Sequence, residues 1–136
     1  MYVPLWVKSN YSFLEGASHP DELLEQAHSM GLPALAITDR DGVYGMVRAH
    51  VVARELGIKL LVGAQITVGE GGSTVVALAQ TRQGYGNLCQ LLSRGQMRCP
   101  KGVAYVTLHE LCDIGEGVLL LCSYPPWLEP LQRAVR

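Results

Sequence analysis

The sequence predicts an α/β fold in which mostly parallel strands are covered by outer helices and carry one hairpin insertion. Short, nearly wholly apolar runs such as Ala34–Thr38 and Val118–Leu121 are typical of strands buried on both faces. Amphipathic stretches of helical period separate these runs. The resulting order of strand, helix, strand, helix and strand indicates right-handed parallel units.

The first strand is expected at Val3–Val7, and the stretch GASHPDELLEQAHSMG is expected to form the helix that follows. Ser18 is the expected N-cap, with Asp21 three residues later in a variant of the capping box. Apolar side chains then recur on one helical face, and Gly31 is a natural C-cap.

The second strand is expected at Ala34–Thr38, directly before the acidic residue Asp39. A second helix is expected over Val43–Leu56 and is closed by Gly57, which suits the left-handed conformation that often ends helices. Lys59–Thr67 is the third expected strand.

The second half of the chain begins with the turn sequence GEGGS at Gly69–Ser73, which separates two β-like runs and predicts a hairpin. A helix containing GYGNLCQLLSRG follows, and then a loop at Gln96–Lys101. Thr107 is expected to cap a short helix, Val118–Leu121 to form the last strand, and Pro125–Arg136 to be partly helical.

Composition limits the class of protein. The chain has 136 residues, of which 49% are hydrophobic and 17% charged, and this is typical of one folded domain. The formal net charge of −1 argues against a surface dominated by phosphate binding but leaves room for a local basic site. No apolar run approaches the roughly 20 residues of a membrane span, and no signal peptide is visible. The four cysteines lack metal-binding spacing, which predicts free thiols in the cytoplasm.

Polar side chains follow three of the expected strands, at the carboxyl ends where parallel α/β sheets usually carry their catalytic and binding residues. They are Lys8, Ser9 and Asn10, then Asp39, Arg40 and Asp41, and finally Gln65. No histidine joins them, because His19, His28, His50 and His109 are expected in helices or loops, as exposed or capping residues. Asp39 is the best single candidate for a metal ligand, and an ion pair with Arg40 or a helix cap is the simpler interpretation of it.

Two other features have weak functional interpretations. GEGGS lacks the lysine and hydroxyl residues of a phosphate loop, so a hairpin turn explains it better. The basic residues Arg98 and Lys101, with Tyr105 nearby, could touch nucleic acid, but the net charge gives this little support.

The segments SNYSFLEGASHPDEL, TDRDGVYGMVRAH and LAQTRQGYGNLCQLLSRG, in this order, resemble the polymerase and histidinol phosphatase (PHP) domain. The resemblance covers Val3 to about Ser123. It is most specific for the PHP domain at the N-terminus of bacterial C-family DNA polymerase III alpha subunits, and within these for the error-prone branch.

The resemblance implies a distorted (β/α)7 barrel that holds up to three metals. In active members the first strand ends in a His-x-His pair, whose positions are Trp6 and Lys8 here. An Asp–His pair is replaced by Asp39 and Arg40, and a metal-bridging Glu by Gln65. The resemblance therefore implies a degenerate site with no metal, no other cofactor and no catalytic residue.

The charges at these positions agree with that interpretation. Lys8 and Arg40 place two fixed positive charges where metal ions would bind, and a lysine within about 4 Å opposes a cation by several kcal/mol at intermediate dielectric. We expect both cations to pair with Asp39 and Asp41. Lys8 and Arg40 as a candidate anion-binding site are the alternative.

These points predict a non-catalytic role for residues 1–136 as the N-terminal PHP module of an error-prone DNA polymerase alpha subunit in DNA replication and translesion repair. The parent would be a cytoplasmic DNA-directed DNA polymerase, a nucleotidyltransferase that contacts DNA and other replication or repair proteins. Two alternatives remain open: a metal-dependent phosphoesterase or proofreading exonuclease, and a free-standing anion-binding module.

Length predicts an incomplete barrel, because a complete (β/α) barrel needs about 200 residues or more. We therefore expect a fragment, a split-gene product or an excised piece whose natural partner is the remainder of the polymerase chain. Apolar faces left without cover predict self-association, or a C-terminal segment around Trp127 that repacks over the gap.

Overall fold

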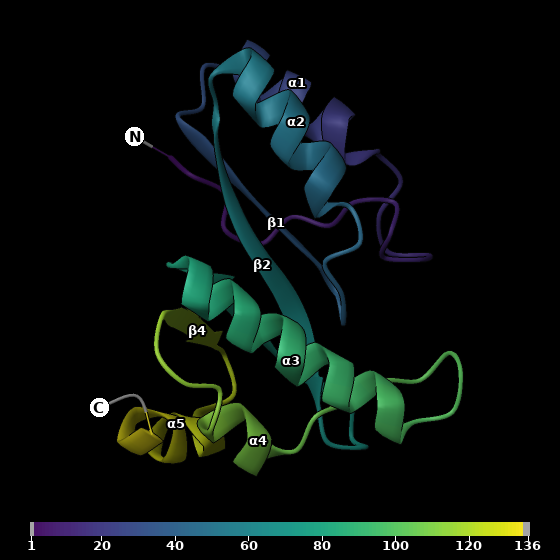
Figure 1. The fold of residues 1–136 in the computed structure, drawn as a ribbon, viewed down its shortest axis with the longest axis vertical. Helices are drawn as coiled ribbons and strands as arrows, with labels where there is room; N and C mark the ends of the chain where they lie inside the picture. Colours follow the sequence, from purple (N-terminus) through teal and green to yellow (C-terminus); the bar gives the residue numbers. More distant parts are fainter. Residues whose placement is uncertain (1, 135–136) are drawn as a thin grey trace.

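The computed structural model describes residues 2–134 and shows a mixed α/β fold (Figure 1). In chain order its elements are α1 (Pro20–Ser29), β1 (Ala34–Arg40), α2 (Met46–Leu56), β2 (Lys59–Val68), β3 (Ser73–Ala79), α3 (Arg82–Arg98), α4 (Leu108–Cys112), β4 (Val118–Cys122), the 3₁₀ turn η1 (Pro125–Trp127) and α5 (Leu128–Ala134). The predicted partly helical C-terminal segment is therefore present, although Val135 and Arg136 lie outside the described residues.

The four strands form one sheet in the order β1-β2-β3-β4. β1 and β2 are parallel, whereas β3 pairs antiparallel with both β2 and β4. β1, β2 and β4 therefore run in the same direction, in agreement with the predicted mostly parallel strands, and β3 is the antiparallel strand of the predicted hairpin insertion. The four strands form an open sheet rather than a barrel. The β2–β3 hairpin is present, and β3 is a central strand because it pairs with β2 on one side and β4 on the other. Its Val75 and Ala77 pack on the helices, and Val76 and Leu78 pack on the opposite face.

The segment Val3–Val7 runs beside β1 without forming a regular strand. The amides of Ala36 and Thr38 donate hydrogen bonds to the carbonyls of Pro4 and Val7, at 2.9 and 2.8 Å. Pro4 has no N–H to return, and the Val7 N–H bonds to the Thr38 hydroxyl at 3.1 Å. The predicted first strand is thus extended and in place, but a proline and a side-chain contact interrupt its ladder.

The first helix, α1, begins one residue later than predicted, because His19 rather than Ser18 is its N-cap. α1 begins after His19, whose N–H donates to Glu22 Oε2 at 2.8 Å, so the capping box lies one residue later than the expected Ser18 and Asp21. Gly57 closes α2 at φ 70°, as predicted.

The third helix starts earlier and ends later than expected. Thr81 caps α3 by accepting a hydrogen bond from the Gly84 N–H at 3.0 Å, and the helix runs on to Arg98. The first three residues of the predicted loop at Gln96–Lys101 are therefore helical. Thr107 caps α4, as predicted.

Two helical layers cover different parts of one face of the sheet (Figure 1). α1 and α2 pack on β1 and the first half of β2, around Leu24, Ile37 and Ala49. α3, α4 and α5 pack on the rest of β2, on β3 and on β4, around Ile66 and Leu88. β2 runs through both groups and connects them.

The opposite face of the sheet is also apolar. Ala36, Val76 and Leu78 are buried there, with Leu61 and Leu121 packed against them. Trp127 does not cover this face: it stacks edge-on against Tyr124, with ring centroids 5.0 Å apart, and packs on the helix-side core with Leu131. Leu128 and Gln132, close to Trp127 in sequence, line a groove together with Val76 and Leu121 of this face, while Leu119 remains 43% exposed.

Candidate functional site

Asp39 lies at the carboxyl end of β1 and is completely buried. Its Oδ1 accepts hydrogen bonds from the Ser9 N–H at 2.7 Å and the Ser12 hydroxyl at 2.6 Å. Its Oδ2 accepts one from the Ser9 hydroxyl at 2.7 Å. A buried carboxylate is stable only when donors replace its water, and here two serines supply three of them.

The same serines fix the loop that follows the first extended segment. The Ser12 hydroxyl accepts from the Arg40 N–H at 3.0 Å, and the Ser9 hydroxyl accepts from the Tyr11 N–H at 3.2 Å. Gly16 closes this loop against the backbone, where an added Cβ would lie 2.2 Å from the Ser9 carbonyl oxygen. The polar residues after Val7 therefore form an ordered loop around Asp39.

The two cations predicted to flank the site converge on Glu15. Lys8 Nζ pairs with Glu15 Oε2, and Arg40 Nη1 lies 2.9 Å from Glu15 Oε1. The hydrogen bond from Lys8 is the main factor that lowers the pKa of Glu15, and Arg40 acts in the same direction. The predicted pairing of the cations with Asp39 is therefore wrong, because the serines already occupy that carboxylate.

Asp41 is held by β2 more than by its arginine neighbour. The N–H and the hydroxyl of Thr67 each donate to its carboxylate at 2.7 Å, whereas Arg40 Nε lies 3.7 Å away. Burial raises the pKa of Asp41, and the hydrogen bonds from Thr67 oppose that rise. Asp41 adopts φ 50°, and its N–H donates to the Gln65 carbonyl at 2.8 Å, so it turns the chain sharply at the sheet edge.

Trp6 and Gln65 meet directly. The indole N–H of Trp6 donates to Gln65 Oε1 at 3.0 Å. This bond occupies the amide oxygen of Gln65, the residue for which the resemblance implies a metal-bridging glutamate in active members. Trp6 itself is 57% exposed.

Sequence reasoning placed these residues at one edge of the sheet but missed four of their partners. Ser9, Ser12, Glu15 and Thr67 were not predicted to bond them; Ser9 was noted only as a strand-end residue and Thr67 only as the last residue of an expected strand. The pattern Ser-x-x-Ser, one residue after the apolar run that ends at Val7, was the available signal, because such hydroxyls commonly bond a nearby acceptor.

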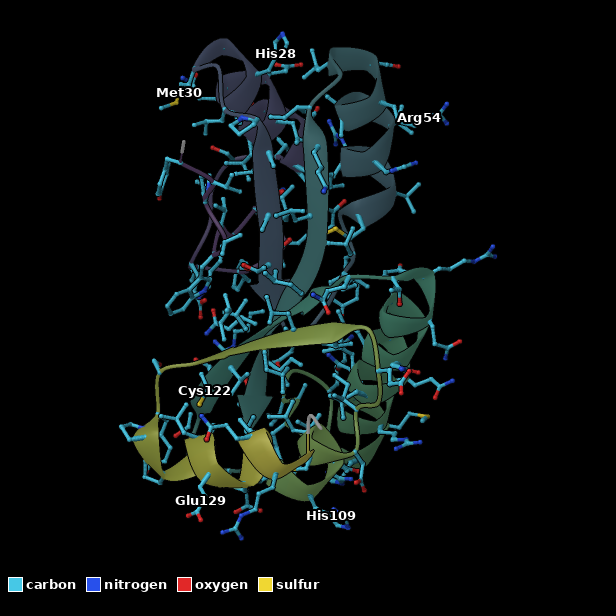
Figure 2. The ribbon with its side chains drawn as sticks, turned by 90° about the vertical axis from the view of Figure 1, so that its left-hand side faces the viewer. His28, Met30, Arg54, His109, Cys122 and Glu129 are labelled. Carbon is cyan, nitrogen blue, oxygen red and sulfur yellow. The ribbon has the colours of Figure 1, made fainter. Side chains whose placement is uncertain are left out.

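The donor set does not fit a metal ion. Within residues 2–134 no group of three or more histidine, cysteine, aspartate or glutamate side chains is placed to hold one. Figure 2 shows His28 and His109 at opposite ends of the molecule, far from a shared site. The carboxylates of Asp39 and Asp41 face hydrogen-bond donors, and that of Glu15 faces two cations.

Two of the basic and aromatic residues predicted as a cluster, Arg98 at the end of α3 and Tyr105 after it, are internally paired. Arg98 binds both carboxylate oxygens of Glu110, and the Tyr105 hydroxyl donates to Glu70 at 3.2 Å. The carboxylate of Glu110 offsets the charge of Arg98, which weakens the attraction of this residue for a phosphate backbone.

The class of fold is that of the amidohydrolase-like and PHP-like proteins. An amidohydrolase from Chromobacterium violaceum, solved with bound sulfate and no metal, matches 70% of this chain and 33% of its own at 28% identity and a TM-score of 0.57. A Bifidobacterium adolescentis protein described as a metal-dependent phosphoesterase shares the fold over 70% of this chain and 33% of its own, at 23% identity and a TM-score of 0.56.

The chain belongs to the PHP domain family, whose model matches residues 5–126. An error-prone DNA polymerase of Rhodopirellula baltica is 41% identical over 118 residues, which are 87% of this chain and 10% of that protein. Those of Ralstonia nicotianae and Caulobacter vibrioides are 47% identical over 105 residues and 36% over 129, which are 74% and 95% of this chain and 10% and 12% of those proteins.

The chain thus spans about a tenth of the length of the curated relatives that it matches. The resemblance noted in the sequence is confirmed at the level of the family and of its error-prone polymerase members. Among residues 2–134, no helix combines the length and the apolar character that crossing a bilayer requires.

Proposed function

We propose that this chain is a non-catalytic N-terminal PHP module of an error-prone DNA polymerase alpha subunit. Its role is structural support for a polymerase that acts in DNA replication and translesion repair in the cytoplasm. The observation that carries the proposal is the buried carboxylate of Asp39, which accepts three hydrogen bonds from Ser9 and Ser12.

The hydrogen bonds and ion pairs of Asp39, Glu15 and Asp41 connect the strand ends to one another, as shared coordination of a metal ion would. In a metal site, ligands from several strand ends are tied to one ion. Here Asp39 ties the loop at Ser9 and Ser12 to β1, Glu15 ties Lys8 to Arg40, and Asp41 ties β1 to Thr67 on β2. The strand ends are therefore held together by side chains that leave no free donor set for a dication.

The parent activity, nucleotidyl transfer by a DNA-directed DNA polymerase, is assigned to the rest of such a protein and to no residue of this chain. The proposed partners are the remainder of the polymerase chain, other replication or repair proteins, and DNA through the parent polymerase. The relatives, which are about ten times longer, support the first of these partners. An isolated chain is also proposed to self-associate through its open apolar face.

Metal analysis tests the non-catalytic proposal. After dialysis against zinc and manganese, elemental analysis should find well under one metal per chain, and EDTA should leave the melting temperature unchanged. A metal bound at this site, with a phosphoesterase or exonuclease activity that Asp39→Ala abolishes, would restore the enzymatic alternative.

Anion binding is the second candidate function. The two cations Lys8 and Arg40 converge on one carboxylate, and the similar Chromobacterium violaceum amidohydrolase holds sulfate without metal. Glu15 already occupies the place between the cations. A phosphate titration followed by calorimetry distinguishes the two functions: saturable binding lost in Lys8→Met supports the anion-binding module, and no binding supports the structural module.

A further inference from the structure

α3 is the longest of the described helices and lies on the outside of the molecule. One side of its 17 residues packs on β2, β3 and β4, through the buried residues Gly84, Leu88, Leu91, Leu92 and Gly95. Figure 1 shows α3 across the outer side of the sheet, with no other described element lying over it. Its other side therefore faces solvent over the length of the helix, about 25 Å at 1.5 Å per residue.

The outward face of α3 carries cations and amides. Gln83, Gln90, Arg94 and Met97 recur at helical spacing and are exposed, so they share this face. The exposed residues of the outward face are Arg82, Gln83, Gln90, Ser93, Arg94 and Met97, and Lys101 is exposed just beyond the helix. Arginine, lysine and glutamine are among the side chains with which proteins bind phosphate oxygens.

This region has few acidic residues. The chain has 12 aspartates and glutamates, but none of them lies between Gly71 and His109 in sequence. Of the ion pairs within residues 2–134, the one in this region joins Arg98 to Glu110, and none involves Arg82, Arg94 or Lys101.

Glu116 is a second acidic residue beside α3, where its carbonyl accepts a hydrogen bond from Asn87 at 3.1 Å. The four cations Arg82, Arg94, Arg98 and Lys101 outnumber Glu110 and Glu116. Positive charge is therefore concentrated on α3 and the loop after it, in a chain whose formal net charge is −1.

The chemistry of this face favours a phosphate backbone over a covering polypeptide. A protein surface that buried the cations would have to supply an acidic partner for each, because an unpaired buried charge is strongly destabilising. A phosphate backbone supplies those negative charges and keeps its interface hydrated. The outward residues include no aromatic ring on which an unpaired base would stack, which favours duplex over single-stranded nucleic acid.

We propose that the outward face of α3 binds the phosphate backbone of duplex DNA without selecting its sequence. Arg82, Arg94 and Lys101 make the charged contacts, and Gln83 and Gln90 donate hydrogen bonds between them. Arg82 and Arg94 lie about 18 Å apart along the helix axis, so they reach different phosphates. The inference rests on the proposed function, in which DNA meets the parent polymerase, and deepens it by giving this module its own contact with DNA.

Fluorescence anisotropy of a short labelled duplex, titrated with this chain over a series of salt concentrations, tests the proposal. The logarithm of the affinity should fall linearly with the logarithm of the salt concentration, with a slope of about −3 for three phosphate contacts. Arg94→Gln should weaken binding several-fold at low salt and reduce the magnitude of the slope by about 1, and Arg82→Gln should act in the same way. Arginine and glutamine have similar helix propensities, so both variants should fold normally.

Arg54→Gln is the matched control. Arg54 is exposed on α2, is absent from the ion pairs within residues 2–134, and is directed away from the molecule in Figure 2. Its replacement changes the net charge by the same amount and should leave both the affinity and the slope unchanged. Equal losses in Arg54→Gln and Arg94→Gln would show that overall charge, and not the face of α3, attracts DNA.

Other outcomes would also overturn the proposal. They are the absence of binding at low salt, tighter binding of a single strand than of the duplex, and competition by polyglutamate as strong as that by unlabelled duplex of equal charge, which would indicate an acidic protein as the partner. In the parent polymerase, a DNA affinity unaffected by Arg94→Gln would mean that the following polypeptide covers α3. Metal analysis of the same protein is independent of all these measurements, so failure of this inference and failure of the non-catalytic proposal are distinguishable.

Discussion

Asp39 shows how a carboxylate is buried at a strand end without a cation. Burying a charge is costly unless donors replace its water, and hydrogen bonds to ionised groups are stronger than those between neutral groups. One backbone N–H and two hydroxyls meet this requirement. Because these donors come from Ser9 and Ser12, the carboxylate also orders the loop between them.

Replacing Asp39 tests whether it acts as this acceptor. Asp39→Ala leaves three buried donors without a partner and should lower the free energy of unfolding by about 3 kcal/mol. Asp39→Asn keeps one acceptor oxygen and should cost clearly less. Urea unfolding of both variants measures the difference. Equal losses would mean that the negative charge matters more than the hydrogen bonds.

At the scale of the element, α4 shows how one side chain serves two elements. Glu110 accepts from the Thr107 N–H at 2.9 Å, which completes a capping box at the start of α4. The same carboxylate binds Arg98 at the end of α3. The hydrogen bond from Arg98 is the main factor that lowers the pKa of Glu110 to about 2 from an ordinary value of 4.5. A five-residue helix is thereby attached to a long one.

This link should make part of the stability depend on pH. Because the pKa of Glu110 is lowered in the folded state, its contribution is present above pH 4.5 and is lost as the pH falls towards about 2. Glu110→Gln should therefore reduce the urea midpoint at pH 7 and have a smaller effect near pH 2. Glu129→Gln is the control, since Glu129 pairs with Arg133 on one exposed helix face and should change little at either pH.

The helix caps were largely predictable from the sequence, because a cap bonds to backbone within a few residues of itself. Thr107 and Gly57 were placed correctly, since each acts on a backbone within a few residues of itself. α1 was misplaced by one residue, because Ser18 and His19 both offered a start and the reach of Glu22 decided between them. The partners of Asp39 were not predictable in this way, because they lie 27 and 30 residues away in sequence.

At the scale of the whole molecule, β2 joins the two helical layers. Its residues Leu60 and Val62 face the cluster under α1 and α2, and Ala64 and Ile66 face the cluster under α3. The apolar pattern predicted each strand but not the order of strands. The position of β3 between β2 and β4 could not be predicted in this way, because a hairpin strand at the margin and one at the centre of a sheet have the same local sequence.

Gly63 lies where β2 passes from one cluster to the other. It pairs with Thr38 on β1 and with Leu78 on β3, and it is buried between them. A Cβ at this position would lie 2.4 Å from the Ala77 carbonyl oxygen, which is backbone of the central strand and cannot move aside cheaply. The two parts of the sheet therefore depend on one residue without a side chain.

Gly63→Ala should accordingly destabilise both parts together, by about 2–4 kcal/mol, as expected for overpacking against a backbone. Trp127→Phe leaves Trp6 to report on the strand-end site, and Trp6→Phe leaves Trp127 to report on the C-terminal half. Unfolding followed at low protein concentration by each tryptophan should shift by the same amount. Gly86→Ala is the matched control: no atom lies within 4 Å of its added Cβ, and alanine in helix α3 should raise the free energy of unfolding by about 0.5–1 kcal/mol. A shift seen by only one tryptophan in Gly63→Ala would show that the two helical layers unfold separately, and that β2 does not couple them.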